Sequence, residues 1–226
     1  VKEGVDEIIR AADYPDIRFF CVPLDMSYEE RDDCSATWQV PSVHTAAAFS
    51  ATAWFFATSL HKALRVPVGI VVSAFGGTRV ESWLNREVLQ GYPDVDLSRE
   101  AIDRCEPVYT RPMLMYNAML APLRNYTIKG FIWYQGESNV GAHHTYAERL
   151  ADMVRLWRDD FALGDIPFYY AEIAPYAYGD NGRGLQGAYL REAQFRAQSL
   201  IPNSGMVSTN DLVEPYELFN IHPRNK

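Results

Sequence analysis

Several features that would place a chain in a specialised class of protein are missing from this sequence. Basic residues do not dominate: 21 lysines and arginines stand against 29 aspartates and glutamates, for a net charge of -8. That balance argues against the basic face that nucleic-acid binding needs. No apolar run approaches the roughly 18 residues that span a bilayer. No internal repeat, heptad or low-complexity tract is visible either. We therefore expect neither nucleic acid nor a membrane as a partner.

Cysteine is also scarce, with three widely spaced residues, Cys21, Cys34 and Cys105, and no Cys-x-x-Cys pair. This pattern argues against a zinc site or a thioredoxin-like redox site. We expect the three thiols mainly as small buried side chains, with a disulfide among them only in an oxidising compartment. His143 and His144 are adjacent and point in different directions, and no further ligand stands at convergent spacing. We therefore expect no metal and no other cofactor.

The 226 residues are 48% hydrophobic, enough for one substantial core, so we expect a single domain over residues 1–226. Apolar runs bounded by breakers predict strands, and apolar residues at helical spacing predict helices. The predicted strands cover residues 17–22, 68–75, 130–134, 168–173 and 205–208. The predicted helices cover residues 46–64, 145–161 and 190–199. Ser42 or Thr45 is expected to cap the first helix.

Strands and helices alternate along the chain, which predicts an α/β fold with a parallel sheet and helices on both faces. Right-handed crossovers bring the carboxyl ends of such strands toward one edge, here at Gly76, Gln135 and Asp211. Two segments break the alternation: residues 84–112 have no clean period, and residues 176–187 are rich in glycine. Loops of this length are usually functional or disordered. We interpret both as loops that shape a substrate site.

The segment most suggestive of chemistry is residues 131–139, where an apolar run ends in Gln135, Gly136, Glu137, Ser138 and Asn139. An acid, two amides and a glycine at the end of a strand fit the place where open α/β sheets bind ligands. Spacing alone supports an alternative equally well. Ser138 could cap a helix outlined by Tyr146, Leu150, Met153, Val154 and Trp157.

Two further motifs accompany this segment in the same order as in a known family. One runs Val71, Val72, Ser73, Ala74, Phe75, Gly76, Gly77, Thr78, and the other runs Asn220, Ile221, His222, Pro223, Arg224, Asn225, Lys226. With residues 14–18 and 117–122, they make nearly the whole chain resemble the sialate O-acetylesterase family of SGNH (GDSL-type) hydrolases. That family is related to acetylxylan esterases with the same Gln-Gly-Glu core. Three ordered motifs are a specific signal, whereas one alone would be weak.

The resemblance implies a three-layer, flavodoxin-like α/β fold and removal of O-acetyl groups from sialic acids by serine-type acyl transfer. It favours a periplasmic or secreted protein, although no signal peptide is observable in this chain. The substrate partner would be an acetylated sugar. The runner-up activity is deacetylation of acetylxylan or another polysaccharide.

One element of the family is missing from residues 1–226. The nucleophilic serine of these esterases lies in a Gly-Gln-Ser-Asn-Met motif after the first strand, and no such string occurs here. The likeness begins downstream of that point. We therefore expect a domain that lacks its first strand, with the serine on a preceding segment or a separate chain. The alternative is a glycan-binding or scaffold protein without catalysis.

His222 is the candidate general base. Ester hydrolysis needs a group that takes the proton of a nucleophilic hydroxyl, and imidazole titrates near neutral pH. Pro223 biases His222 toward an extended loop conformation. By resemblance the orienting carboxylate is Glu137, because the places two and three positions before the histidine hold Asn220 and Phe219 rather than aspartate. Asp211 is the alternative acid, followed by Glu214.

The resemblance also implies donors for an oxyanion, which are often the largest single contribution to catalysis. They are the amide of the missing serine, the Gly76 amide and a side-chain amide from either Gln135 or Asn139. Glycine suits the second role because it allows close approach of the backbone.

Substrate-binding residues are assigned from chemistry. A sialic acid carries a carboxylate that an arginine can hold with two hydrogen bonds, and Arg79 and Arg224 are the candidates. Trp83 and Tyr134 are expected to stack on a sugar face, with a place in the core as the alternative for both.

Overall fold

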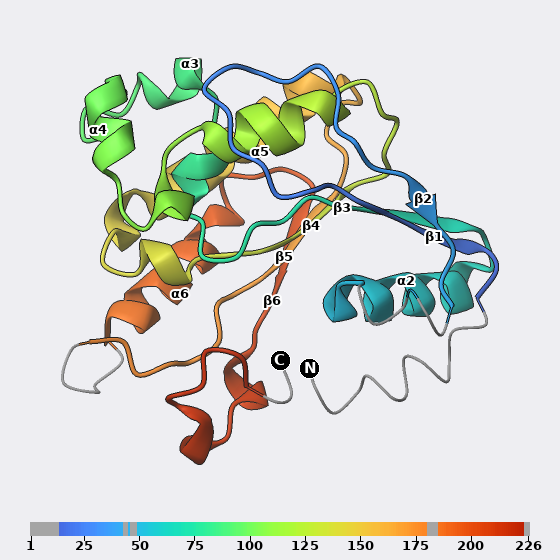
Figure 1. Cartoon of the computed structure of the whole chain (residues 1–226). Helices are drawn as coiled ribbons and strands as arrows, with labels where there is room; N and C mark the ends of the chain where they lie inside the picture. Colours follow the sequence, from blue (N-terminus) through green and yellow to red (C-terminus); the bar gives the residue numbers. More distant parts are fainter. Residues whose placement is uncertain (1–13, 43–44, 46–48, 180–184, 224–226) are drawn as a thin grey trace. The chain divides into compact units, whose positions relative to one another are not determined.

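The computed structural model describes residues 14–42, 45, 49–179 and 185–223. The chain divides into two compact units. The first comprises Val1–Asp25 and Asp33–Ala74, and the second comprises Met26–Asp32 and Phe75–Lys226. Figure 1 follows the chain by colour through both units.

The first unit is a small sheet covered by one helix. Its strands are β1 (Ile17–Cys21), β2 (Trp38–Gln39) and β3 (Val68–Val72), in the order β2-β1-β3. β1 pairs with β3 in parallel and with β2 antiparallel. Phe19 of β1 stacks on Phe49 with 4.3 Å between ring centroids, and Trp54 completes a buried aromatic cluster. β2 was not predicted, because two residues are too short to show a period.

Helix α2 (Ala51–Leu64) of this unit begins later than predicted. The Ser50 side chain accepts a hydrogen bond from the Ala53 backbone N–H at 3.3 Å and so caps the helix. The prediction that Ser42 or Thr45 caps this helix is wrong: these two residues bond to each other across a separate turn. Residues 46–48 lie outside the described part of the chain.

The second unit contains the parallel sheet β4-β5-β6, made of β4 (Phe131–Tyr134), β5 (Phe168–Ala171) and β6 (Ser204–Val207). All pairs are parallel, with Phe131 opposite Phe168 and Phe168 opposite Ser204. The connections are α5 (His143–Phe161) and α6 (Leu185–Ala197). These elements confirm the α/β class and the predicted order of strands and helices.

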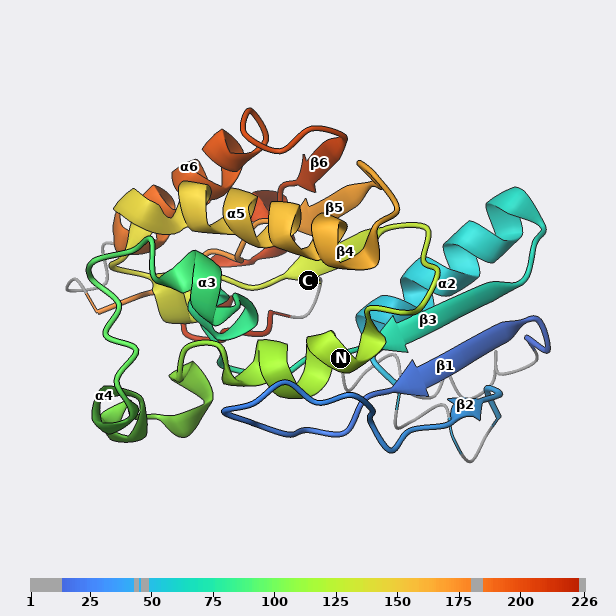
Figure 2. The ribbon, with the colours of Figure 1, turned by 90° about the horizontal axis from the view of Figure 1, so that it is seen from above.

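Helices α5 and α6 pack on each other and on the same face of this sheet (Figure 2). Right-handed crossovers between strands that are neighbours in both sequence and space place both helices on one side. Trp157 of α5 lies against Phe131 and Trp133, with 5.3 and 5.4 Å between centroids. From α6, the Gln194 carbonyl accepts a hydrogen bond from the Tyr170 hydroxyl at 2.7 Å.

The segment between the two sheets carries short helices instead of long ones. They are η2 (Val80–Trp83), α3 (Arg86–Leu89), α4 (Arg99–Arg104), η3 (Val108–Thr110), η4 (Tyr116–Leu120) and η5 (Ala121–Leu123). Leu89 and Ile102 are fully buried, so part of residues 84–112, the segment without a clean period, packs into the core. Shorter turns follow the strands: η6 (Glu137–Asn139), η7 (Asn210–Leu212) and η8 (Pro215–Glu217).

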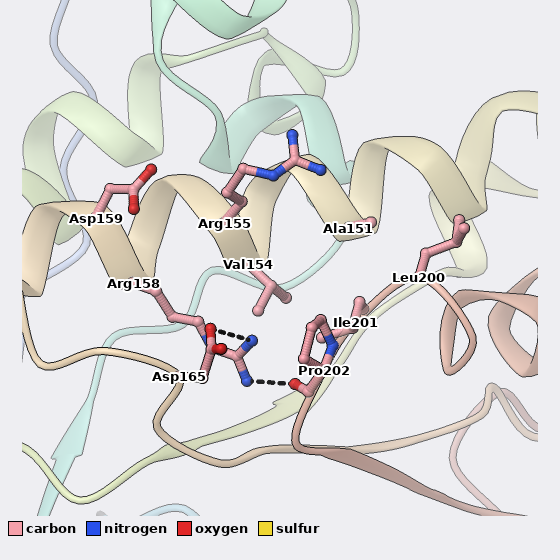
Figure 3. A pocket seen from close by; sticks show the side chains of 9 residues that line it. All are labelled: Ala151, Val154, Arg155, Arg158, Asp159, Asp165, Leu200, Ile201 and Pro202. Carbon is pink, nitrogen blue, oxygen red and sulfur yellow. Dashed lines mark hydrogen bonds and ion pairs between the residues drawn. The ribbon is translucent and has the colours of Figure 1, made fainter.

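A small pocket of about 130 Å³ lies at the amino ends of β5 and β6, against α5 (Figure 3). Arg158 of α5 forms one wall and donates hydrogen bonds to the carbonyls of Ile166 at 2.7 Å and Pro202 at 2.8 Å. It also pairs with Asp165 at 3.4 Å. This arginine therefore joins the helix to the two loops that precede the strands. Within the described ranges, no helix is long and apolar enough to cross a bilayer.

Candidate active site

The polar segment after β4 forms a tight turn followed by η6. Gly136 makes the turn sterically possible, because a Cβ atom at this position would lie 2.6 Å from Ile173 Cγ2 and 3.1 Å from Leu190 Cδ2. Real Cβ atoms do not approach other atoms so closely, and only glycine fits without a shift of the core. The turn therefore brings Gln135, Glu137 and Asn139 together at the carboxyl end of the strand.

Gln135 is a structural centre of this turn. Its Nε2 donates to the Thr78 carbonyl at 2.9 Å and to Asn139 Oδ1 at 2.8 Å. Its Oε1 accepts from the Tyr146 hydroxyl at 3.0 Å, and its backbone carbonyl accepts from Gln194 Nε2 at 2.9 Å. An amide nitrogen has two hydrogens, so both Gln135 hydrogens are engaged inside the protein.

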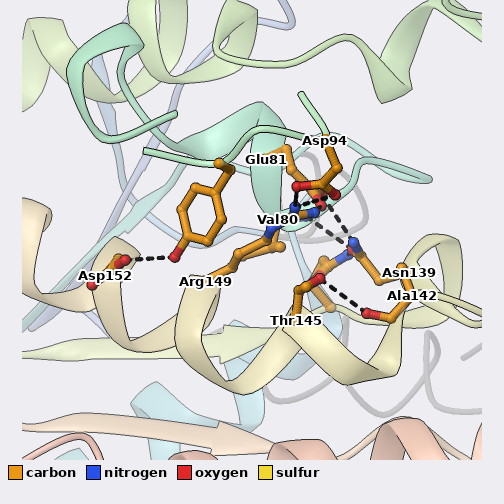
Figure 4. A network of polar contacts seen from close by, with 10 residues as sticks. Val80, Glu81, Asp94, Asn139, Ala142, Thr145, Arg149 and Asp152 are labelled. Atoms are coloured by element: carbon orange, nitrogen blue, oxygen red, sulfur yellow. Dashed lines mark hydrogen bonds and ion pairs between the residues drawn. The ribbon is translucent and has the colours of Figure 1, made fainter. Parts of the chain in front are cut away.

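Asn139 continues the same chain of hydrogen bonds and is 2% exposed. Its Oδ1 also accepts from the Val80 backbone N–H at 3.0 Å, and its Nδ2 donates to Glu81 Oε2 at 2.9 Å. Figure 4 shows this network between the turn at Asn139 and the helix η2. Ser138 Oγ also donates to the Gly77 carbonyl at 2.6 Å. These hydrogen bonds join the turn after β4 to the turn after β3, which is distant in sequence.

Ser138 does not cap α5. That helix begins at His143 with Ala142 in the capping position and no side-chain cap. The helix-cap interpretation of Ser138 is therefore wrong. The predicted apolar face of the helix, in contrast, is confirmed, since Tyr146, Leu150, Met153, Val154 and Trp157 are all buried.

A buried charge cluster supports the turn, and sequence reasoning missed it. Arg149 is 3% exposed and donates to Glu81, which is 6% exposed, and to both oxygens of Asp94 at 2.6 and 2.5 Å. Burial opposes the charge of Arg149, but the hydrogen bonds to Asp94 and the charge of Glu81 outweigh it and raise the pKa of Arg149. The hydrogen bond from Arg149 lowers the pKa of Asp94. The signal in the sequence was an arginine between Tyr146 and Met153 at helical spacing, hence on an apolar face.

Glu137 is held by Tyr134. The Tyr134 hydroxyl donates to Glu137 Oε1 at 2.5 Å and accepts from the Ala174 backbone N–H at 3.2 Å. Burial, followed by the charge of Glu137 and this hydrogen bond, raises the pKa of Tyr134 well above its usual range. Tyr134 therefore stays protonated and fixes one carboxylate oxygen of Glu137. Its stacking on a sugar remains a prediction.

The predicted oxyanion glycine lies in the turn that follows β3. A Cβ at Gly76 would have nothing within 4 Å, and the residue is exposed. Glycine is required at the next position, because Gly77 has a φ of +82° and a Cβ there would lie 2.6 Å from the Tyr109 ring. Thr78 Oγ1 donates to the Phe75 carbonyl at 2.9 Å and closes this turn.

Trp83 belongs to the core. It is 2% exposed, its Nε1 donates to Thr78 Oγ1 at 2.9 Å, and its ring meets Trp133 edge-on at 6.1 Å. A ring enclosed in this way offers no face to a sugar, so the prediction that Trp83 binds substrate is wrong. Arg79 is exposed just before η2, where its binding role remains a prediction. Arg224 lies outside the described residues.

The remaining catalytic candidates lie in the segment after β6. His222 is exposed, and its backbone N–H donates to Asn220 Oδ1 at 3.1 Å. Asp211 is exposed in η7. Glu214 forms a capping box with Glu217 at the start of η8, which gives it a structural use. The roles of His222, Glu137 and Asp211 remain predictions.

Glu172 is a second buried carboxylate that sequence reasoning missed. It follows β5, is 4% exposed, and accepts from the Ser208 hydroxyl and from the Thr209 backbone N–H at 3.0 Å. It therefore ties the carboxyl end of β5 to that of β6. Its signal was a lone acid between Ala171 and Ile173 in an apolar run. Among the described residues, no group of three or more histidine, cysteine or acidic side chains could hold a metal ion. The three cysteines are half-buried and free.

The fold and the site define an α/β protein with a hydrogen-bonded polar turn at the carboxyl edge of its parallel sheet. A family model described as carbohydrate esterase, sialic acid-specific acetylesterase, matches residues 6–222. The chain belongs to this family.

Known relatives agree with this assignment. The chain is 28% identical over 267 residues to sialate O-acetylesterase of Mus musculus, covering 97% of the chain and 49% of the mouse protein. It is 25% identical to the Homo sapiens enzyme, of which it covers 46%. The chain thus spans about half the length of the curated relatives it matches.

Solved structures show the same fold. A carbohydrate acetylesterase from Xanthomonas citri aligns with a TM-score of 0.84 and 30% identity, covering 98% of this chain and 48% of that one. A protein from Arabidopsis thaliana aligns with a TM-score of 0.57 and 17% identity over 91% of this chain and 73% of its own. The second likeness concerns the fold alone.

Replacing Gly136 with alanine should destabilise the protein. The added methyl group would press on Ile173 and Leu190, and overpacking of this kind costs roughly 1 to 3 kcal/mol. Urea unfolding followed by circular dichroism measures the loss. Gly76→Ala is the matched control, since it adds the same methyl group in open space. Equal stabilities for the two variants would show that the turn after β4 is not packed as described.

Proposed function

We propose that this chain carries the base, the orienting acid and part of the oxyanion site of a serine-type carbohydrate esterase that removes O-acetyl groups from sialic acids. The observation that carries the proposal is the set of hydrogen bonds that joins Gly77, Thr78 and Val80 to the Gln135–Asn139 turn. The first of these turns includes Gly76, and the second includes Glu137, which Tyr134 holds. Membership of the acetylesterase family supports the substrate class.

The proposed reaction needs a serine that residues 1–226 do not supply in the family's motif. A serine from a preceding segment or a separate chain attacks the acetyl carbonyl while His222 accepts its proton. The tetrahedral intermediate collapses, and the imidazolium protonates the departing sugar alkoxide. Water then releases acetate from the acyl-serine by the same proton transfers. Glu137 holds the imidazole in the required tautomer.

Counting hydrogens favours Asn139 over Gln135 as the side-chain oxyanion donor. Both Gln135 hydrogens have acceptors, Thr78 and Asn139. For Asn139 the described contacts use one hydrogen of the amide, toward Glu81, which leaves the second for a ligand. A fixed donor of this kind is worth roughly 3 to 4 kcal/mol in the transition state. Gly76 supplies a backbone donor in the proposal.

The substrate class is tested by acetate release from O-acetylated sialic acid and from acetylated xylan. We expect the longest natural polypeptide that contains these residues to prefer the sialic acid and to be inhibited by a serine-directed phosphonate. The 226-residue chain alone should release no acetate, because it lacks the serine motif. Preference for xylan would move the activity to polysaccharide deacetylation. Tight glycan binding without any acetate release would show a binding protein instead of an enzyme.

The identity of the orienting acid is tested by two substitutions in the active polypeptide. Glu137→Gln keeps an oxygen for the Tyr134 hydroxyl and should preserve the melting temperature. It should lower kcat by about 100- to 10,000-fold, since the imidazole loses its orienting charge. Asp211→Asn should change kcat less than threefold. The opposite ranking on one acetyl ester would transfer the role to Asp211.

The role of His222 is tested by the pH dependence of kcat/KM. The imidazole must be neutral to accept the serine proton, so activity should fall as the pH drops and the ring becomes protonated. His222→Ala should remove this acid limb along with most of the activity. His144→Ala, a change in an exposed histidine at the start of α5, should leave both unchanged. Wild-type kcat/KM in the His222→Ala variant would refute the assignment.

A further inference from the structure

Glu81 ends a chain of hydrogen bonds that runs through the proposed site in one direction. The Tyr146 hydroxyl donates to Gln135 Oε1, and Gln135 Nε2 donates to Asn139 Oδ1. Asn139 Nδ2 in turn donates to Glu81 Oε2 (Figure 4). The distances of these three bonds are 3.0, 2.8 and 2.9 Å. Each group in the chain donates to the next, and Glu81 is the final acceptor.

The direction of this chain is not a property of the amides themselves. An amide side chain presents an oxygen at one end and two N–H groups at the other, and a half-turn exchanges them. A carboxylate has no hydrogen and can only accept. Glu81, which is paired with Arg149, therefore requires the nitrogen of Asn139 to face it. The Val80 N–H, which can only donate, requires the Asn139 oxygen on the other side. The Thr78 carbonyl, which can only accept, requires Gln135 Nε2.

Arg149 makes a buried carboxylate tolerable at this position. An isolated charge in the interior would cost several kcal/mol or lose its ionisation. Arg149 donates to the second oxygen of Glu81 and leaves the first for Asn139. The guanidinium is itself held by Asp94, whose side chain is 57% exposed, and lies 4.7 Å from the Tyr92 ring centroid. Charge and orientation are thus both set from outside the turn.

We propose that Glu81, paired with Arg149, is a positioning residue that holds the Asn139 amide in the orientation that the Val80 N–H also requires and thereby places the Gln135–Glu137 turn for catalysis. The inference rests on the proposed function of that turn, but the orientation itself is a property of the folded chain. It predicts that an isosteric loss of the Glu81 charge disturbs the site more than it disturbs the fold.

The test compares Glu81→Gln with Asp94→Asn in the longest natural polypeptide that contains these residues. Both changes remove one negative charge from Arg149, but only Glu81 contacts Asn139. A glutamine at position 81 is neutral, so it holds the Asn139 N–H more weakly than a carboxylate does. We expect Glu81→Gln to lower kcat at least tenfold with KM within twofold of wild type. Asp94→Asn should leave both within twofold.

A second readout does not depend on turnover. In the wild-type protein the Asn139 side-chain N–H bound to Glu81 should exchange slowly with deuterium, as measured by NMR with the signal assigned through its loss in Asn139→Asp. Glu81→Gln should speed this exchange at least tenfold, whereas Asp94→Asn should not. If the wild-type polypeptide releases no acetate, the proposed function fails, and the exchange rates alone support or overturn the orientation.

Two results would overturn the inference. One is wild-type kcat and unchanged Asn139 exchange in Glu81→Gln. The other is an equal loss of kcat in Glu81→Gln and Asp94→Asn with equal losses of melting temperature, which would indicate general destabilisation. If Glu81→Gln does not fold, Glu81→Asp replaces it. The aspartate keeps the charge but is one methylene shorter, which withdraws its oxygen from Asn139 Nδ2, and the same changes in kcat and exchange are expected.

Discussion

The hydrogen bonds of Asn139 and Gln135 are the contacts on which the proposed site depends. They join the turn after β3 to the turn after β4, through the backbone of Thr78 and Val80. Neither turn contains an element of regular structure long enough to fix itself. A side chain at Gly77 or Gly136 would collide with its neighbours, so the present backbone positions require glycine at both. The glycines thus make the backbone positions of the two turns sterically possible, and the amide hydrogen bonds select one arrangement of the turns.

The ion cluster behind this turn is better explained by specificity than by stability. Burying a charged pair seldom gains free energy relative to apolar residues of the same size, because both ions lose their hydration. An apolar pair at Glu81 and Arg149 would leave Asn139 Nδ2 without the acceptor that holds it in the turn. A polar interior network that is fully bonded selects one arrangement of a core. The same reasoning applies to Glu172, whose Oε1 accepts hydrogen bonds from the Ser208 hydroxyl and the Thr209 backbone N–H at the carboxyl end of β6.

Sequence patterns predicted the long elements well and the small ones poorly. The face of α5 was readable because Tyr146, Leu150 and Trp157 repeat at helical spacing over many residues. Ser138 was ambiguous because a cap is a local signal, and its hydroxyl bonds instead to Gly77, 61 residues away. Trp83 is equally suited to a sugar site and to a core, and only its enclosure decides. The side-chain partners of Glu81 come from two other segments, 58 and 68 residues away, so no local pattern could reveal them.

Two buried arginines attach α5 to neighbouring segments of the chain. Arg149 and Arg158 are nine residues apart, which is about two and a half helical turns, so they leave the helix on opposite sides. One reaches the charge cluster near the turn after β4, and the other reaches the carbonyls that precede β5 and β6. These contacts on opposite sides of the helix oppose its rotation about its own axis. A residue inserted between the two arginines would turn one of them by about 100° relative to the other and withdraw it from its partners. Length changes in this family should therefore accumulate in the connecting loops and spare the middle of this helix.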